Sequence, residues 1–323
     1  MKNTCFAKIV PVILILNILT GCSVLQPVEA PDNEPIRMGY TEWWGDYTLV
    51  VGKEKGFFQQ QGVQVEPIFH EVYSEYIIDL ASGQMDGAFL AMGDVININH
   101  VSPMKVVGVT DDGGADSIVV SPDIESIADL QGKKVGVRIG TQYELMVTEM
   151  LRSAGMDSSD VTIVEVDPEE VLTALSSDRV QAVYTWEPFL SEAVADGNKV
   201  IFPNEKMRLF PDVIVFRRSV VEQRPDDIKA FLRAWFQTVE YRMQHEGETR
   251  DIAAKYLELR PEEIQPDNNL KILTLSDNKA IFDIQDKNSI YTVTNITSDY
   301  LISIGAVTQQ VDLLELIDPN FLP

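Results

Sequence analysis

Residues 36–69, IRMGYTEWWGDYTLVVGKEKGFFQQQGVQVEPIF, hold a strand, a helix and a second strand in close succession. The apolar segment 36–40 predicts the first strand, the helical spacing of 49–61 predicts a helix that Gly62 ends, and the alternation of 63–69 predicts the second strand. Strand–helix units of this length are typical of a mostly parallel sheet with helices on both faces. The stretch therefore predicts an α/β protein.

The same alternation continues along the chain. It predicts a helix over 73–81, a strand over 86–92, a helix over 94–101 and a strand over 105–109. After an isolated β-like segment at 117–121, the pattern repeats at 133–139, 141–154, 161–166, 169–176, 182–185, 187–195 and 199–202. A second apolar segment, 213–216, then precedes helical stretches at 226–245, 248–259 and 298–304.

Two α/β halves joined by two strand-like crossings predict a hinged, bilobal fold with a helical C-terminal tail. We assign residues 36–117 plus 217–323 to lobe 1 and residues 118–216 to lobe 2. Ligands of open α/β sheets bind beyond the carboxyl ends of the strands. We therefore expect a ligand cleft between the two lobes.

The N-terminal residues predict export. Lys2 and Lys8 give a positive start before a short apolar run, which is typical of a signal peptide over residues 1–21 and too short for a permanent transmembrane helix. The sequence Leu-Thr-Gly-Cys at 19–22 resembles the bacterial lipobox, which predicts lipid attachment, palmitate included, at Cys22. An ordinary signal peptide that contains a cysteine is the alternative. Residues 22–35 hold three prolines and predict a flexible tether.

Composition excludes several classes of function. The formal net charge of -24 argues against nucleic acid and anionic lipid headgroups as ligands, although an acidic surface can also serve solubility alone. Cys5 leaves with the signal and Cys22 carries the lipid, so the mature fold has no disulfide, cysteine-ligated zinc or thiol nucleophile. The three histidines lack metal-ligand spacing. We expect a binding protein without metal or cofactor.

Eight short motifs, in order, carry a resemblance to a known family over about residues 36–265. They are Gly39-Tyr40 followed by tryptophans, GKEKGFF (52–58), LASGQMDG (80–87), PMKVV (103–107), IADLQGKKVG (127–136), DVT (160–162), VYTWEPF (183–189) and IKAFLRA (228–234). The chain resembles the extracytoplasmic solute-binding proteins of ABC importers, in the branch that serves nitrate, alkanesulfonates, taurine and thiamine-pyrimidine precursors. The resemblance implies a periplasmic-binding-protein type II-like fold, closure about a hinge, a membrane permease as partner and a monomer.

Aromatic and polar residues at the predicted strand ends are ligand candidates. Trp43 and Trp44 follow the first strand, where the family contacts its ligand, so we expect at least one to stack on the ligand; packing of both in the core is the alternative. Thr141 opens a helix and offers a hydroxyl beside free N–H groups, or serves only as an N-cap. By family position, Trp186 or Glu187 lies near the ligand, and Glu187 could instead serve the helix dipole.

Carboxylates are the other candidates. Asp94 follows the third strand and either faces the ligand or caps the next helix. The segment 111–116 holds Asp112 and Asp116 where the first crossing begins; it lacks the spacing of a calcium loop, so we expect a hinge loop with a carboxylate in the cleft.

The charges near the expected cleft indicate the ligand. Acidic candidates are Glu42, Asp46, Asp94, Asp112, Asp116, Glu144 and Glu187, whereas Arg138 is the nearest basic residue by sequence. Carboxylates with tryptophans suit a cationic amine or a nitrogen heterocycle. We predict a small nutrient of that kind, with an alkanesulfonate or taurine as the alternative.

Two rival functions remain. Some relatives of this fold make a thiamine pyrimidine with a histidine and a cysteine-rich iron motif, but the mature chain has no cysteine cluster. A lipoprotein that reports its ligand to a membrane sensor would need the same cleft. The predicted location is outside the cytoplasm, anchored by lipid to a bacterial membrane, in the periplasm or on the outer face of the cell membrane.

Overall fold

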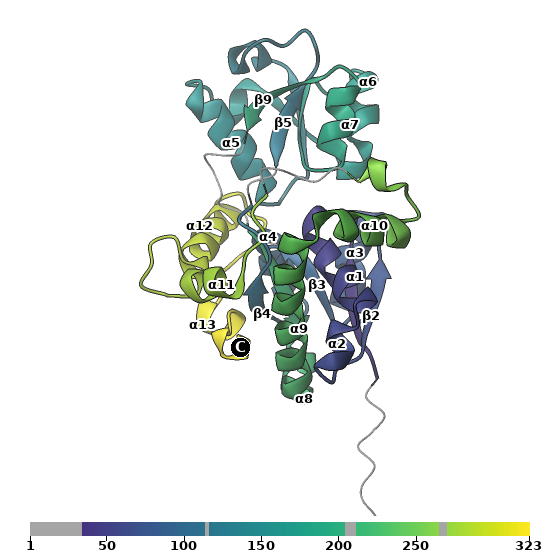
Figure 1. Ribbon diagram of the computed structural model, residues 1–323. Coiled ribbons are helices and arrows are strands. Elements are labelled where there is room, and N and C mark those ends of the chain that lie inside the picture. Colours follow the sequence, from purple (N-terminus) through teal and green to yellow (C-terminus); the bar gives the residue numbers. More distant parts are fainter. Residues whose placement is uncertain (1–33, 114–115, 204–210, 265–269) are drawn as a thin grey trace, which may run out of the picture. The chain divides into compact units, whose positions relative to one another are not determined.

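The structure is a computed structural model that describes residues 34–113, 116–203, 211–264 and 270–323 (Figure 1). The predicted signal peptide (1–21), the predicted lipid site Cys22 and all but the end of the tether (22–35) lie outside the described residues. They stay predictions. In the described ranges, none of the helices is both long and apolar enough to cross a membrane.

One mixed sheet has the strand order β2-β1-β3-β10-β4. Its strands are β1 (Ile36–Tyr40), β2 (Val65–Phe69), β3 (Gly87–Ala91), β4 (Met104–Val109) and β10 (Asp212–Arg217). β1 pairs in parallel with β2 and β3, whereas β10 runs antiparallel between β3 and β4. The helices between these strands are α1 (Tyr47–Glu54), α2 (Phe57–Gln60), α3 (Tyr73–Ser82) and α4 (Met92–Asn99).

A second sheet has the order β7-β6-β8-β5-β9. Its strands are β5 (Ser117–Val120), β6 (Lys134–Val137), β7 (Thr162–Glu165), β8 (Ala182–Thr185) and β9 (Lys199–Pro203), with helices α5 (Tyr143–Ser153), α6 (Val171–Ser176) and α7 (Phe189–Ala195). β6 is parallel to β7 and β8, and β5 is antiparallel to β8 and β9. The predicted α/β class with two halves is confirmed.

Each sheet is buried on both faces, as the apolar runs of its strands require. On β3, Phe89 packs in one core with Trp235, while its neighbours Ala88 and Leu90 pack in another. On β8, Val183 belongs to one core and Tyr184 to the other. Alternate residues of a strand point to opposite faces, so these strands need helices on both sides.

The C-terminal part is helical, as predicted. It contains α8 (Arg218–Gln223), α9 (Pro225–Gln244), α10 (Glu246–Leu257), α11 (Leu275–Ile281), α12 (Ile290–Ser303) and α13 (Leu313–Leu316). α9 packs on α1 and α2, and α12 packs on α4, so the tail covers both faces of the first sheet. The expected helix at 298–304 is only the last part of α12, and α8, α11 and α13 were not predicted.

Two predicted boundaries differ from the observed elements. The helix expected at 49–61 is broken into α1 and α2 at Gly56, whose φ of 70° lies in the left-handed region that favours glycine. The segment 212–216, which we assigned to lobe 2, pairs with β3 of the first sheet, and Ser117, which we assigned to lobe 1, begins β5 of the second sheet. The division into two lobes stays a proposal, and we now place the point where the chain crosses back to lobe 1 before Asp212.

One hydroxyl separates two neighbouring strands near their carboxyl ends. β1 and β3 pair only at Met38 and Gly87. Beyond this point the Tyr76 hydroxyl accepts the Phe89 N–H (2.8 Å) and donates toward the carbonyls of Gly39 (3.2 Å) and Phe89 (3.0 Å). A Cβ at Gly39 would come within 2.5 Å of the Tyr76 ring, so residue 39 must be glycine for this side chain to fit. The separated strand ends leave room for the site.

Candidate functional site

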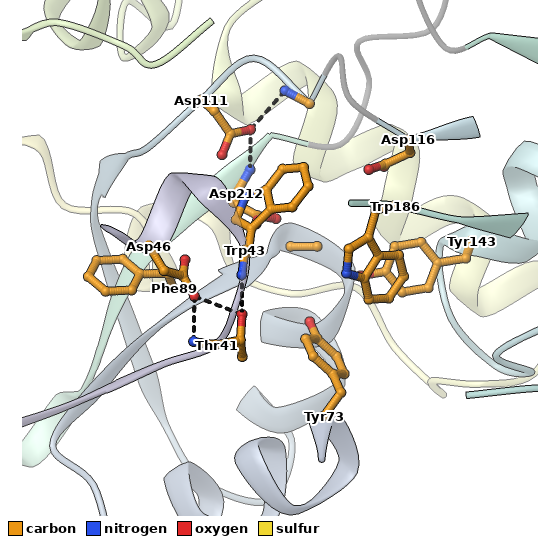
Figure 2. Close-up of a pocket in the computed structure, with 12 residues that line it drawn as sticks. Thr41, Trp43, Asp46, Tyr73, Phe89, Asp111, Asp116, Tyr143, Trp186 and Asp212 are labelled. Carbon is orange, nitrogen blue, oxygen red and sulfur yellow. Dashed lines mark hydrogen bonds between the residues drawn. The ribbon is translucent and has the colours of Figure 1, made fainter. Parts of the chain in front are cut away.

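A pocket lies where the strand ends of the two sheets supply side chains (Figure 2). Its lining residues are Thr41, Trp43, Asp46, Tyr73, Phe89, Ala91, Asp111, Gly113, Asp116, Tyr143, Trp186 and Asp212. Asp111 follows β4, Trp186 follows β8, and Asp212 begins the antiparallel β10, which brings its first residue to the same edge as the carboxyl ends of β3 and β4. The pocket is partly open to solvent.

Three carboxyl groups, which we call the aspartate trio, line this pocket: Asp46 and Asp111, which are buried, and Asp212, which is half-buried. Asp46 is 2% exposed, and its Oδ2 accepts hydrogen bonds from the Thr41 N–H (2.9 Å) and hydroxyl (3.0 Å). Asp111 is 1% exposed and accepts bonds from the Thr110 hydroxyl (2.8 Å) and the Gly113 N–H (2.9 Å). In the described part of the chain, no ion pair involves any of the three.

The trio is held in an environment that disfavours negative charge. Burial raises the pKa of Asp46 to about 8 and that of Asp111 to about 6. Burial, together with the nearby charges of Asp111 and Asp46, raises the pKa of Asp212 well above its usual range. A bound cation would favour the ionised form of all three, because it supplies an opposite charge that the described pocket lining lacks.

Aromatic rings form the other walls. Trp186 lies edge-on to Tyr73, with ring centroids 5.6 Å apart, and lies 5.2 Å from Tyr143. Tyr143 in turn stacks on Tyr184 at 4.9 Å. Trp43 lies toward the trio: its indole nitrogen is close enough to the Asp111 carboxyl to lower the pKa of that group, yet it makes no hydrogen bond of standard geometry among the described residues. Such faces suit flat or cationic ligands.

Of the predicted residues, Trp43, Asp116 and Trp186 line the pocket. The Asp116 carboxylate accepts a hydrogen bond from the Tyr184 hydroxyl. Trp44, in contrast, belongs to the core of the first sheet and packs edge-on against Tyr47 at 5.3 Å. The alternative of core packing therefore describes Trp44, whereas Trp43 is the tryptophan that reaches the pocket.

Asp94 lies behind the aromatic wall and not in the lining. Its carboxylate accepts bonds from the hydroxyls of Tyr73 (3.0 Å) and Tyr143 (3.2 Å) and lies 3.5 Å from the Arg138 guanidinium. These four residues form what we call the Asp94 cluster. It fixes two pocket rings and joins α4 to residues 138–143, where the Gly93 N–H also bonds Gln142 Oε1 and Asn97 Nδ2 donates to Gly140 O at 3.2 Å.

Three further predicted residues also lie outside the lining. The Thr141 hydroxyl donates to Arg138 O (2.6 Å) and accepts the Tyr143 N–H (3.2 Å), so it shapes the turn before α5. The Glu187 carboxylate accepts the Ser191 N–H (3.0 Å) and hydroxyl (2.9 Å) at the start of α7. Asp112 lines a separate surface hollow and accepts the Lys271 N–H (3.3 Å). Local hydrogen bonds therefore occupy these three side chains.

Sequence reasoning missed several lining residues, namely Thr41, Tyr73, Phe89, Asp111, Tyr143 and Asp212. Asp111 and Tyr143 stand within two positions of predicted residues, so the strand-end rule pointed to the right segments but to the wrong side chains. Asp212 was missed because an antiparallel strand brings its first residue to the site, whereas the rule for parallel strands looks only at the last.

The fold is that of the periplasmic binding proteins. The chain belongs to the NMT1/THI5-like family, whose model matches residues 47–249. This confirms the resemblance that the sequence motifs indicated.

Individual relatives are distant. A protein of Brucella abortus (strain 2308) named as a binding protein is 26% identical over 244 residues, 73% of this chain and 75% of the relative. A protein of Bacillus subtilis (strain 168) named as an aliphatic sulfonates-binding protein is 25% identical over 284 residues, 85% of this chain and 83% of the relative. The taurine-binding periplasmic protein of Escherichia coli (strain K12) is 28% identical over 128 residues, 38% of this chain and 39% of the relative.

Solved structures share the fold at low identity. The periplasmic aliphatic sulphonate-binding protein of Escherichia coli has a TM-score of 0.71 at 18% identity, covering 88% of this chain and 92% of the other. The nitrate-binding protein of Synechocystis PCC 6803 has a TM-score of 0.71 at 15%, covering 90% and 88%. A desulfurization enzyme has a TM-score of 0.66 at 16%, covering 90% and 97%. The fold thus occurs in binding proteins and in an enzyme.

Proposed function

We propose that this protein is the solute-binding component of an ABC importer and captures a small molecule that carries a protonated amine or a nitrogen heterocycle. The observation that carries this proposal is the aspartate trio beside Trp43, in a pocket whose described lining contains no basic side chain. An ammonium or protonated ring nitrogen can donate to the trio while its apolar part rests on the aromatic walls. An anion would meet buried carboxyl groups instead.

The importer role rests on the family and on the names of the relatives. Members of such importers bind their solute by closing two lobes about a hinge and then dock on a membrane permease. Export and a lipid anchor at Cys22 remain part of this proposal. We favour binding over catalysis because the described pocket lining includes no histidine, cysteine or lysine that could serve as a base or nucleophile.

A sulfonate or taurine is the second candidate, because the Bacillus subtilis relative, similar over 85% of this chain, is named for aliphatic sulfonates. A sulfonate group would need a cation. Arg138, whose guanidinium lies 4.8 Å from the centre of the Tyr73 ring, already pairs with Asp94 (3.5 Å) and Asp167 (3.3 Å). Taurine could place its ammonium on the trio, whereas a simple alkanesulfonate could not.

Calorimetric titration of the mature protein at pH 7.5 tests the choice. The panel holds alkylamines and diamines, aminopyrimidines, taurine, and alkanesulfonates of matched chain length. We expect binding of amine-bearing compounds, at least tenfold weaker in Asp212→Asn, and unchanged binding in the control Asp123→Asn, which alters an exposed aspartate outside the pocket. Binding of alkanesulfonates without any amine would overturn the proposed ligand class.

A further inference from the structure

One buried arginine reaches the ligand segment from a distant part of the chain. Arg242, near the end of α9, is 6% exposed. Its guanidinium donates to the carbonyls of Trp44 (2.9 Å) and Gly45 (3.2 Å) and to the Thr48 hydroxyl, and lies 4.8 Å from the centre of the Trp44 ring. No ion pair within the described residues includes it.

The contacted backbone carries two pocket side chains. Trp44, Gly45 and Asp46 form one 3-10 turn, η1, which directly follows Trp43. This turn leads directly into α1, and the guanidinium adds side-chain donors to two of its carbonyls. The planar guanidinium supplies several donors in a fixed geometry. The position of the guanidinium therefore determines where the backbone of residues 43–46 can lie. The side chains of Trp43 and Asp46 are placed with that backbone.

The same group supplies charge. Burial lowers the pKa of Arg242 to about 10, so it is a cation at neutral pH, and its charge lowers the pKa of Asp46 against the larger effect of burial. The titratable groups that act on Asp46 or are acted on by it are Asp111 after β4, Asp212 on β10, Tyr40 on β1, Tyr47 on α1, Tyr76 on α3 and Arg242 on α9. Arg242 is the cation of this set.

We propose that Arg242 is a positioning residue of the ligand pocket: it holds residues 43–46 by their carbonyls and places a buried positive charge near Asp46. Its role as part of a ligand site rests on the proposed function. Arg242 does not line the pocket itself, so it acts on a ligand only through Trp43 and Asp46.

Two readouts on the ligand-free protein test this role. The first is the carboxyl NMR titration of Asp46, assigned with Asp46→Asn; the second is the ¹⁹F line of 5-fluorotryptophan at position 43, assigned with Trp43→Phe. In Arg242→Gln we expect Asp46 to titrate at higher pH by roughly half a unit or more, and the Trp43 line to move. Arg242→Lys keeps the positive charge but lacks the planar guanidinium with its several donors, so only the Trp43 line should move. Arg233→Gln, an exposed arginine of the same helix, should change neither.

A folded Arg242→Gln protein in which neither readout moves would overturn the proposal. If Arg242→Gln does not fold, the Trp43 line of Arg242→Lys is the deciding measurement. If neither variant folds, the Trp43 line of Thr48→Val is used instead, because this substitution removes one acceptor of the Arg242 guanidinium and leaves the arginine in place. An unmoved line in the deciding variant overturns the proposal. Neither readout needs a ligand. Failure of amine binding would therefore overturn the proposed function but would not contradict the positioning role of Arg242.

Discussion

At the residue scale, the pocket depends on carboxyl groups whose pKa values are raised by burial. Asp46, Asp111 and Asp212 come from three separate places in the sequence and line one pocket, in which the first two are buried and Asp212 is half-buried. Carboxyl groups without a basic partner cost free energy when ionised in such a place. Proteins retain costly buried groups of this kind chiefly at functional sites, which is why the trio carries more weight for function than the other acidic residues of this chain.

Trp186 offers a direct test at this scale. Its ring lies between Tyr73 and Tyr143 and is half-buried, so alanine would remove a stacking face without opening the core. We expect Trp186→Ala to weaken binding of the amine ligand by about tenfold or more, corresponding to 1–3 kcal/mol, with little change in the melting temperature. Calorimetric titration and a thermal melt measure both. An unchanged dissociation constant would remove Trp186 from the ligand site.

At the scale of elements, the sheet opens where the ligand is expected. The Tyr76 hydroxyl from α3 replaces strand–strand hydrogen bonds between β1 and β3, and the rings of Phe89 and Trp235 stack at 4.7 Å on the other side of β3. A helix side chain thus completes the hydrogen bonding that the strands cannot complete themselves. The pocket can then form without unpaired backbone groups.

Removing this hydroxyl should be costly. Tyr76→Phe leaves the buried Phe89 N–H without its partner, and we expect a loss of about 1–3 kcal/mol in the free energy of unfolding, measured by urea denaturation. The control is Tyr291→Phe, a buried tyrosine whose hydroxyl makes no hydrogen bond with the described residues. If the two variants lose equal stability, the Tyr76 hydroxyl does not hold the strands as described.

At the scale of the whole molecule, the trio ties stability to pH. A carboxyl group with a raised pKa binds its proton more tightly in the folded chain than in the unfolded one, so its contribution is present below the unfolded pKa and is lost as pH rises through the folded pKa. With values of about 8 for Asp46 and about 6 for Asp111, the loss falls between roughly pH 4 and pH 8.

We therefore expect the ligand-free protein to melt at a lower temperature at pH 8 than at pH 5, and Asp46→Asn to reduce this difference. Carboxylates with lowered pKa values, such as Asp86, which Arg37 and Arg217 hold ionised against the effect of burial, lose their contribution only at lower pH. Burial raises the pKa of Glu42 to about 6, so Glu42 contributes in the same window, and the comparison with Asp46→Asn identifies the part that belongs to Asp46. Affinity for an amine should rise over the same window, because binding displaces protons. A melting temperature independent of pH would contradict the assigned burial of the trio.

The sequence predicted the fold well because the fold follows from local periodicity. The strand at 182–185 and the helix at 226–245 match β8 and α9 almost residue for residue, since their apolar spacing decides both type and length. The segment 213–216 was predicted as a crossing strand and included in lobe 2, whereas it pairs with β3 and β4, because an apolar segment does not reveal its pairing partner. Trp43 and Trp186 could be predicted from strand ends, whereas Asp212 and Arg242 depend on tertiary contacts between residues far apart in sequence.

The Asp94 cluster has a kinetic consequence. Asp94 and Asn97 of α4 bond residues of the other sheet's half directly, through Arg138, Tyr143 and Gly140, with no ligand between them. If the halves separate for release, these bonds must break whichever molecule occupies the pocket. The residence time of a captured solute then has a component that belongs to the protein alone, and chemically different solutes would leave at rates more alike than their affinities.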